Sequence, residues 1–97
     1  MISEKRQDDG VTIVTLEGRI DAITAPRLKE ELHELIAQGH TRMVVNLDGI
    51  GFIDSAGLGV LVSCLRRCAS EGGDLRLAEV PAFCRSIFEL TRLTRVF

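Results

Sequence analysis

The residues most able to carry chemistry lie together at 53–59, in the run Ile-Asp-Ser-Ala-Gly-Leu-Gly. Ser55 stands just before an apolar stripe of helical period, and we therefore expect it to be the N-cap of a helix. Gly57 and Gly59 fall in the first turn of that helix, where each costs about 1 kcal/mol relative to alanine. Close approach of another backbone or of a ligand to the helix start would explain both glycines.

A serine at a helix start is also suited to phosphate chemistry. Unpaired N–H groups and the positive end of the helix dipole favour an anion there. A phosphoryl group on Ser55 would bring about −1.5 to −2 charges beside the carboxylate of Asp54. The surface charge would change sharply, while the fold need not melt. A second interpretation stays open at this point: Ser55 is only a helix cap, and the glycines only permit tight packing.

Other kinds of site lack the residues that they need. A nucleophilic triad requires a histidine base, and both His33 and His40 fall on or just after one predicted helix, where we expect solvated side chains. The cysteines Cys64, Cys68 and Cys84 show no CxxC spacing, and we expect buried reduced thiols rather than metal ligands. We therefore expect no catalysis, no metal and no cofactor.

The composition excludes further classes. The chain has 97 residues, of which 45% are hydrophobic and 27% charged, with a formal net charge of −2. This length makes one domain, residues 1–97. The weak charge and the absence of Trp and Tyr argue against nucleic acid as a partner. No apolar run approaches the roughly 18 residues of a membrane span, so we expect a cytoplasmic protein without a membrane partner.

The elements that must position Ser55 follow from the periodicity. Residues 11–16 are rich in β-branched side chains and are bounded by Asp9-Gly10 and Gly18, so they indicate a strand, and residues 2–7 form its antiparallel partner across an Asp-Asp-Gly turn. A helix follows, with Thr24 as its cap and Gly39 at its end. Its apolar stripe consists of Leu28, Leu32, Leu35 and Ile36.

The second half of the chain continues the alternation. Residues 43–47 indicate a strand covered on both faces, and residues 48–54 a loop. A helix from Ser55 to the glycine pair at 72–73 and a strand at 75–78 come next. Pro81 opens a third helix, whose stripe is Phe83, Ile87 and Leu90. The fold class is therefore α/β, a mixed sheet of four to five strands with about three helices.

The run 43–59, Met-Val-Val-Asn-Leu-Asp-Gly-Ile-Gly-Phe-Ile-Asp-Ser-Ala-Gly-Leu-Gly, resembles the signature of the STAS domain of bacterial anti-sigma factor antagonists. Residues 16–21, 72–77 and 87–93 resemble earlier and later parts of the same family in the right order. The resemblance covers nearly the whole chain. Chains of that family usually continue past the position of Phe97 with a last strand segment and a terminal helix, so we expect this helix to be missing here.

The resemblance implies a partner-switching regulator without enzymatic activity. Ser55 would be phosphorylated by an anti-sigma factor serine kinase, which the unphosphorylated form binds so that the sigma factor is released. A metal-dependent serine phosphatase would reverse the modification. The same module controlling a non-sigma output, such as secretion or a signalling complex, and a phosphate- or nucleotide-binding sensor are the alternatives. We expect a monomer or weak dimer.

The partner surface expected around Ser55 has two parts. The resemblance carries over Asp21 and the motif neighbours of the serine, and the apolar pattern adds an exposed rim. Leu58 belongs to this rim but also to the core stripe, so we expect it to be half-buried. The full set of expected contact residues is Asp21, Ile50, Phe52, Asp54, Ser55, Ala56, Gly57, Leu58 and Gly59.

Overall fold

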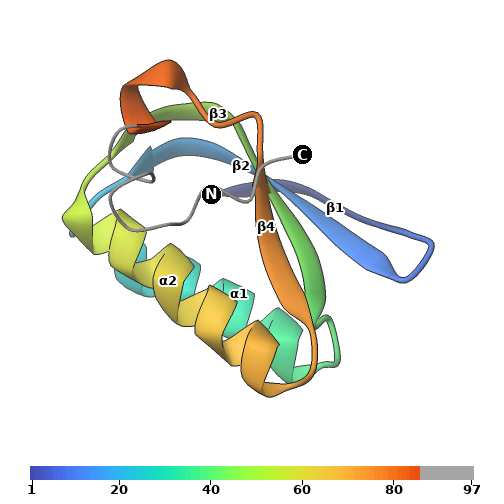
Figure 1. Ribbon diagram of the computed structural model, residues 1–97. Helices are drawn as coiled ribbons and strands as arrows, with labels where there is room; N and C mark the ends of the chain where they lie inside the picture. Colours follow the sequence, from blue (N-terminus) through green and yellow to red (C-terminus); the bar gives the residue numbers. More distant parts are fainter. Residues whose placement is uncertain (86–97) are drawn as a thin grey trace.

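Four strands and two long helices alternate along the chain in the computed structural model, which describes residues 1–85 (Figure 1). In chain order they are β1 (Ile2–Asp8), β2 (Val11–Ile20), α1 (Ala25–Ala37), β3 (Arg42–Ile53), α2 (Ser55–Ser70) and β4 (Asp74–Ala78). The strands form one sheet in the order β1-β2-β3-β4. Strand β1 runs antiparallel to β2, whereas β2, β3 and β4 are parallel. The predicted α/β class with a mixed sheet is confirmed.

The turn between β1 and β2 has the geometry that its residues favour. Asp9 and Gly10 both adopt a positive φ, of 52° and 81°. Two consecutive left-handed residues define a type I′ turn, whose twist matches that of the flanking strands, and Asp-Gly is one of its preferred pairs. The predicted hairpin is therefore confirmed, and it sets the register of β1 on β2.

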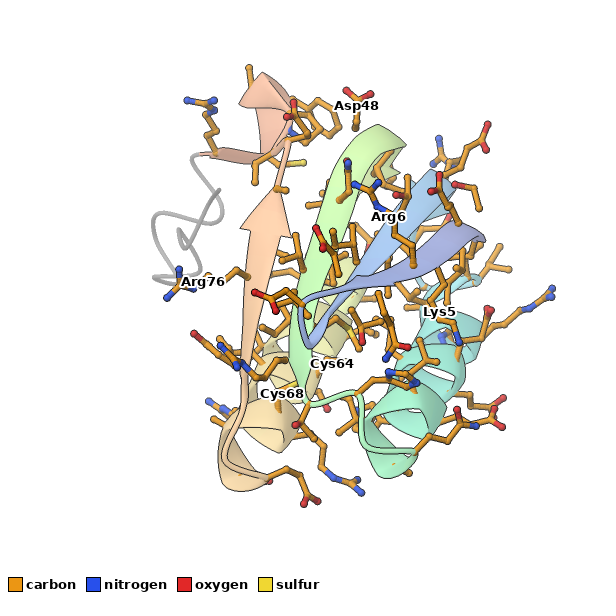
Figure 2. The ribbon with its side chains drawn as sticks, turned by 90° about the vertical axis from the view of Figure 1, so that its right-hand side faces the viewer. Lys5, Arg6, Asp48, Cys64, Cys68 and Arg76 are labelled. Atoms are coloured by element: carbon orange, nitrogen blue, oxygen red, sulfur yellow. The ribbon has the colours of Figure 1, made fainter. Side chains whose placement is uncertain are left out.

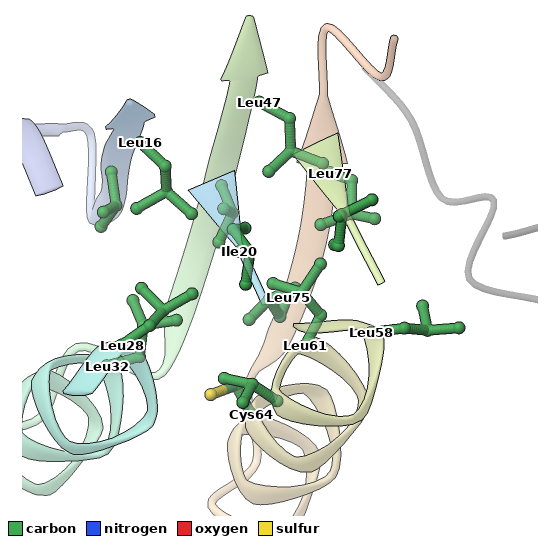
Figure 3. Packing of buried hydrophobic residues seen from close by; sticks show 14 of the residues in the cluster. Leu16, Ile20, Leu28, Leu32, Leu47, Leu58, Leu61, Cys64, Leu75 and Leu77 are labelled. Carbon is green, nitrogen blue, oxygen red and sulfur yellow. The ribbon is translucent and has the colours of Figure 1, made fainter. Parts of the chain in front are cut away.

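Both helices cover the same face of the sheet (Figure 1). Alternate residues of β2 and β3 are buried on that face, as the period of a strand requires. Figure 3 shows Leu28 of α1 and Leu61 of α2 pointing from the helices toward the strands. The largest fully buried side chains come from β2, β3, β4, α1 and α2, and they are Thr12, Val14, Leu16, Ile20, Leu28, Leu32, Val45, Leu47, Leu61, Leu75 and Leu77.

The opposite face of the sheet carries a different set of side chains. Figure 2 views the sheet from this side, with Arg6 and Arg76 in front. The register aligns Arg6 with Ile13, Ile13 with Val44, and Val44 with Arg76, so an apolar pair is flanked by two cations across the sheet. The ends of this row are polar, whereas the helix-covered face is apolar.

The segment at 48–54 was predicted as a loop, and this was wrong. Strand β3 runs on to Ile53, because β2 also continues past Leu16 and keeps pairing with it. The register shifts twice over this extension, between residues 15 and 17 and between 18 and 19 of β2. Gly49 permits the irregular pairing, since a Cβ there would lie 2.8 Å from the carbonyl oxygen of Leu16.

The predicted third helix lies at the end of the described part of the chain. Residues 82–85 are helical, and Phe83 among them is exposed rather than packed as part of an apolar stripe. Ile87 and Leu90, which complete the predicted stripe, lie outside the described residues. The fifth strand of the predicted four to five and the predicted early end at Phe97 also concern residues outside the described part.

Candidate functional site

The candidate site is built on the carboxyl ends of β2 and β3, which finish side by side. Ile20 pairs with Ile53 at the last register position. The next residue of the chain, Asp54, donates its backbone N–H to the carbonyl oxygen of Ile20 at 3.1 Å. Two segments, residues 21–24 and residues 54–59, therefore leave the sheet as neighbours and carry most of the predicted site residues.

The start of α2 is capped by Asp54 and not, as predicted, by Ser55. Asp54 has the extended backbone of an N-cap, with φ −113° and ψ −171°, and its Oδ1 accepts from the backbone N–H of Gly57 at 3.0 Å. Aspartate and serine cap equally well, so the residue whose backbone is extended takes the position. Ser55 becomes the first helical residue, and its side chain is exposed. Its hydroxyl is therefore not used to cap the helix.

The two glycines of α2 have different surroundings. A Cβ on Gly57 would lie 2.6 Å from Cγ2 of Ile20, 2.8 Å from the Ile20 carbonyl oxygen and 2.8 Å from Cγ1 of Ile53. The predicted close approach of another backbone is thus confirmed for Gly57. A Cβ on Gly59 would meet nothing within 4 Å, so packing inside this chain does not require glycine there.

The loop between β2 and α1 is organised by Asp21. Its Oδ1 accepts from the backbone N–H groups of Ile23 at 3.0 Å and Thr24 at 3.1 Å. The backbone N–H of Thr24 makes the largest contribution to a lowered pKa of the Asp21 carboxyl, and Ile23, Arg19 and the Thr24 hydroxyl lower it further against the opposing effect of desolvation. Asp21 is consequently an ionised, positioned group at the predicted partner surface.

Thr24 holds the other side of this loop. Its hydroxyl donates to the carbonyl oxygen of Arg19 at 2.7 Å and accepts from the backbone N–H of Asp21 at 3.0 Å. Thr24 does stand at the predicted N-cap position of α1, but its side chain makes no capping hydrogen bond. The hydroxyl closes the loop instead, so residues 21–24 form a tight turn in which the side chains of Asp21 and Thr24 are held by hydrogen bonds.

Of the three residues predicted to form an exposed apolar rim, one is exposed in the structure. Phe52 is 37% exposed, whereas Ile50 at 4% and Leu58 at 8% belong to the core. Ile50 is buried because β3 continues as a strand, and Leu58 because it lies on the face of α2 that meets the sheet. Sequence reasoning missed Ile23, which is 86% exposed and the most exposed large hydrophobic residue of the described chain.

A cation lies over Phe52. The guanidinium carbon of Arg19 is 4.4 Å from the centre of the Phe52 ring, a distance typical of a cation–π contact. The Nε of the same side chain is 3.4 Å from Oδ2 of Asp21. Arg19 therefore connects the end of β3 to the loop at 21–24.

A shallow groove of about 480 Å³ runs along α2 from Ser55. Its lining consists of Ser55, Leu58, Gly59, Val62, Ser63 and Arg66. The hydroxyl of Ser55 thus opens on a surface that another molecule can reach, and the missing side chain of Gly59 widens this surface one turn further along the helix.

A match over nearly the whole chain shows its family. The family model described as the STAS domain matches residues 3–97. The chain belongs to the STAS domain family. This STAS domain is 32% identical over 88 residues to the anti-sigma-B factor antagonist of Bacillus subtilis, and the match covers 91% of the chain and 80% of that relative.

Two solved structures extend the comparison. An anti-sigma factor antagonist from Mycobacterium paratuberculosis aligns with a TM-score of 0.82 and 26% identity over 97% of the STAS domain and 82% of that chain. The phosphorylated form of SpoIIAA, a Bacillus cell fate determinant, aligns with a TM-score of 0.79 and 20% identity over 97% and 87%. At that identity the likeness to SpoIIAA shows the fold alone.

The cysteines of this STAS domain do not form a reactive site. Cys64, Cys68 and Cys84 are buried free thiols, as predicted. Burial raises the pKa of the Cys64 thiol to about 12 and that of Cys68 to about 11, which makes both thiols inert at neutral pH. Within residues 1–85, no group of histidine, cysteine, aspartate and glutamate side chains is arranged to hold a metal ion.

Both histidines were predicted to be solvated side chains, but each is partly buried and lies within hydrogen-bond distance of a hydroxyl group. His33 Nε2 lies 3.2 Å from Ser63 Oγ, and His40 Nδ1 lies 2.9 Å from Oγ1 of the buried Thr12. Each ring therefore connects two elements of the fold. None of the helices within residues 1–85 has the length and apolar character of a bilayer span.

Proposed function

We propose that this STAS domain is an anti-sigma factor antagonist that acts without catalysis of its own and is controlled by phosphorylation of Ser55. The single observation that carries the proposal is the separation of two roles at the start of α2. Asp54 caps the helix, and the exposed Ser55 beside it has a hydroxyl that the fold does not use. A hydroxyl at this position can be modified without loss of the cap.

The names of relatives support the antagonist role. The relative from Bacillus subtilis is named an anti-sigma-B factor antagonist, and so is one from Staphylococcus aureus at 31% identity over 80 residues. The fold neighbour SpoIIAA has been solved in both an unphosphorylated and a phosphorylated form. We infer that the partner here is an anti-sigma factor serine kinase and that a metal-dependent serine phosphatase restores the free hydroxyl.

The proposed switch is electrostatic. A phosphoryl group on Ser55 brings about −1.5 to −2 charges to the first turn of α2, where the helix dipole tolerates an anion and the fold need not change. The same charge, beside the carboxylate of Asp54, must lose its hydration when a partner docks over it. Burying charge without a counter-ion is costly, so we expect phosphorylation to lower the affinity for the partner by at least about tenfold.

Phosphotransfer is tested directly. The wild-type chain is incubated with ATP and each anti-sigma factor kinase encoded in the same genome, and intact mass is measured. One phosphoryl group is expected on the wild type and on Ser70→Ala, a matched variant at the far end of α2. Ser55→Ala is expected to gain none, and phosphorylation of Ser55→Ala at the wild-type level would contradict the assignment.

The charge mechanism is tested with variants that mimic the two states. Calorimetry with the kinase is expected to show that Ser55→Ala binds with an affinity near that of the wild type. The same is expected of Ser55→Asn, whose side chain is the neutral isostere of aspartate. Ser55→Asp is expected to bind at least about tenfold more weakly. Equal affinities of Ser55→Asp and Ser55→Asn would exclude charge as the cause.

A further inference from the structure

Basic side chains gather where α1 and α2 lie side by side on the sheet (Figure 3). His33 Nε2 of α1 lies 3.2 Å from Ser63 Oγ of α2, and both side chains are half-buried. The pKa of His33 is lowered first by burial and then by the positive charges of Lys29 and Arg67, which act on the ring from both helices. Arg66 and Ser63 line the same groove. We define the α1–α2 basic cluster as Lys29, His33, Ser63, Arg66 and Arg67.

The cations of this cluster are poorly neutralised. Within residues 1–85, neither Lys29 nor Arg66 has a carboxylate at ion-pair distance. Arg67 pairs with Glu71 at 3.5 Å, but both side chains are exposed to water, which weakens the pair. The cluster therefore holds more positive than negative charge.

The acidic residues of α1 beside the cluster point elsewhere. Glu30 follows Lys29 and Glu34 follows His33, and both glutamates are exposed. Successive residues of a helix are rotated by roughly 100°, so neighbours in sequence do not face one another. Lys29 and His33 are four residues apart and share a face. The helix thus brings the basic side chains together and directs the carboxylates away from them.

These residue types match one class of ligand. Lysine provides a compact charge, arginine a fork of N–H donors and serine a hydroxyl, and such donors bind phosphate and other oxyanions in proteins. A dianion placed among Lys29, Arg66 and Arg67 offsets their mutual repulsion. Salt screens this attraction less than on an open surface, because His33 and Ser63 are half-buried.

The contact between His33 and Ser63 couples anion binding to a proton. While Nε2 of His33 carries no proton, the Ser63 hydroxyl donates to it and does not donate to a ligand. Once Nε2 is protonated, it donates to Ser63 Oγ, and the hydroxyl proton is available to an oxyanion. A bound dianion also offsets the charges that oppose protonation of the ring. Anion binding and protonation of His33 therefore favour each other.

We propose that the α1–α2 basic cluster is a binding site for a small phosphate-bearing molecule, held as a dianion by Lys29, Arg66 and Arg67 and by the hydroxyl of Ser63. The site does not rest on the proposed function, because Ser63 lies about 12 Å beyond Ser55 along the axis of α2. In this position the ligand bridges α1 and α2.

Binding is tested by NMR titration of the full chain with inorganic phosphate at constant pH and physiological ionic strength, where diffuse attraction is screened. The chain has two histidines, so their ring signals are readily distinguished. The His33 signal is expected to shift saturably, with a Kd of about 1 mM. His40, whose Nδ1 lies 2.9 Å from Thr12 Oγ1, is the internal control and is expected to stay unchanged. A shift without saturation, or equal shifts of both rings, would overturn the site.

Variants locate the ligand. Lys29→Gln and Arg67→Gln are each expected to bind phosphate about tenfold more weakly, since each removes a charged donor. Arg27→Gln is the matched control and is expected to bind as wild type, because Arg27 pairs with Glu31 at 3.6 Å and is 82% exposed. Equal losses in all three variants would indicate diffuse attraction and refute the proposal. Ser63→Ala keeps the net charge and is expected to lose about fivefold, whereas wild-type affinity would exclude its hydroxyl as a ligand.

The proton coupling gives a separate readout. Sulfate keeps two negative charges throughout the titration of a histidine, so any change in its affinity with pH reports the protein. Sulfate is expected to bind the wild type several-fold more tightly at about pH 6 than at about pH 8, and His33→Gln is expected to lose this dependence. A wild-type affinity independent of pH would contradict the donation from Ser63 that the site requires.

Discussion

Gly57 and Gly59 lie two residues apart in α2, and the same substitution at each is expected to change stability in opposite directions. Both lie within α2, near its start, so alanine removes up to about 1 kcal/mol of unfavourable backbone entropy at either one. At Gly59 the added Cβ meets nothing within 4 Å. Gly59→Ala should therefore stabilise the fold by about 0.5–1 kcal/mol.

Gly57 is different because its neighbours cannot all move. The added Cβ would lie 2.8 Å from the carbonyl oxygen of Ile20, which belongs to β2 and accepts from the backbone N–H of Asp54. Contacts at 2.6 Å and 2.8 Å to the side chains of Ile20 and Ile53 add to the crowding. Overpacking of a core typically costs about 1–3 kcal/mol, and a backbone neighbour favours the upper end. After the gain in helix propensity, we expect a net loss of about 2 kcal/mol.

Thermal unfolding followed by circular dichroism measures both effects. For a chain of this size, about 1 kcal/mol corresponds to a shift in Tm of roughly 4–8 °C. Gly59→Ala should unfold a few degrees above the wild type and Gly57→Ala about 10 °C or more below it. A Gly57→Ala variant as stable as the wild type would refute the close approach of α2 to β2. A destabilised Gly59→Ala would refute the open surface at that position.

Three further outcomes are expected. Asp54→Ala should lose about 1 kcal/mol of stability in urea unfolding, whereas Ser55→Ala should stay within about 0.5 kcal/mol of wild type; equal losses would contradict the assigned cap. The pKa of His33 is lowered by burial and then by nearby cations, so the folded state binds its proton less tightly than the unfolded state. Stability should consequently fall as the pH drops below about 6.5, less so in His33→Gln, and an equal fall in both would exclude His33 as the source. The Cys64 and Cys68 thiols should react with a thiol reagent at pH 8 only at the rate of unfolding, and fast reaction of the native protein would contradict their burial.

The element order of the described chain could be predicted from its residues, since periodicity reports the face that each element buries. The Asp-Gly hairpin, the apolar stripe of α1 and the β-branched residues of β2 all carried local signals. The extension of β3 to Ile53 did not, because it depends on pairing with residues 17–20 across an irregular register. Gly49 suggested a loop, yet it is a strand residue at a close approach of two backbones. A one-dimensional pattern does not distinguish these two uses of glycine.

The candidate site was predictable to a similar extent. Gly57 and Gly59 conflict with the propensity of a helix start, and this conflict marks the segment around Ser55 from its residue types alone. The cap could not be assigned, because Asp54 and Ser55 are adjacent and equally suitable, and only the backbone angles decide between them. Ile23 gave no signal at all, since a single aliphatic residue in a short loop belongs to no periodic pattern that would report its burial. Its exposure depends on how the side chains on either side of it fold the loop.

The strand order carries a consequence for where nucleotide chemistry can occur. Open α/β sheets bind their small-molecule ligands in the crevice that forms where successive connections leave on opposite faces. Strands β2, β3 and β4 follow one another without such a reversal, and α1 and α2 lie on one face, so the described part of this sheet is not opened by a topological switch. The proposed phosphorylation of Ser55 accordingly assigns the nucleotide to the partner kinase and the acceptor hydroxyl to the start of α2.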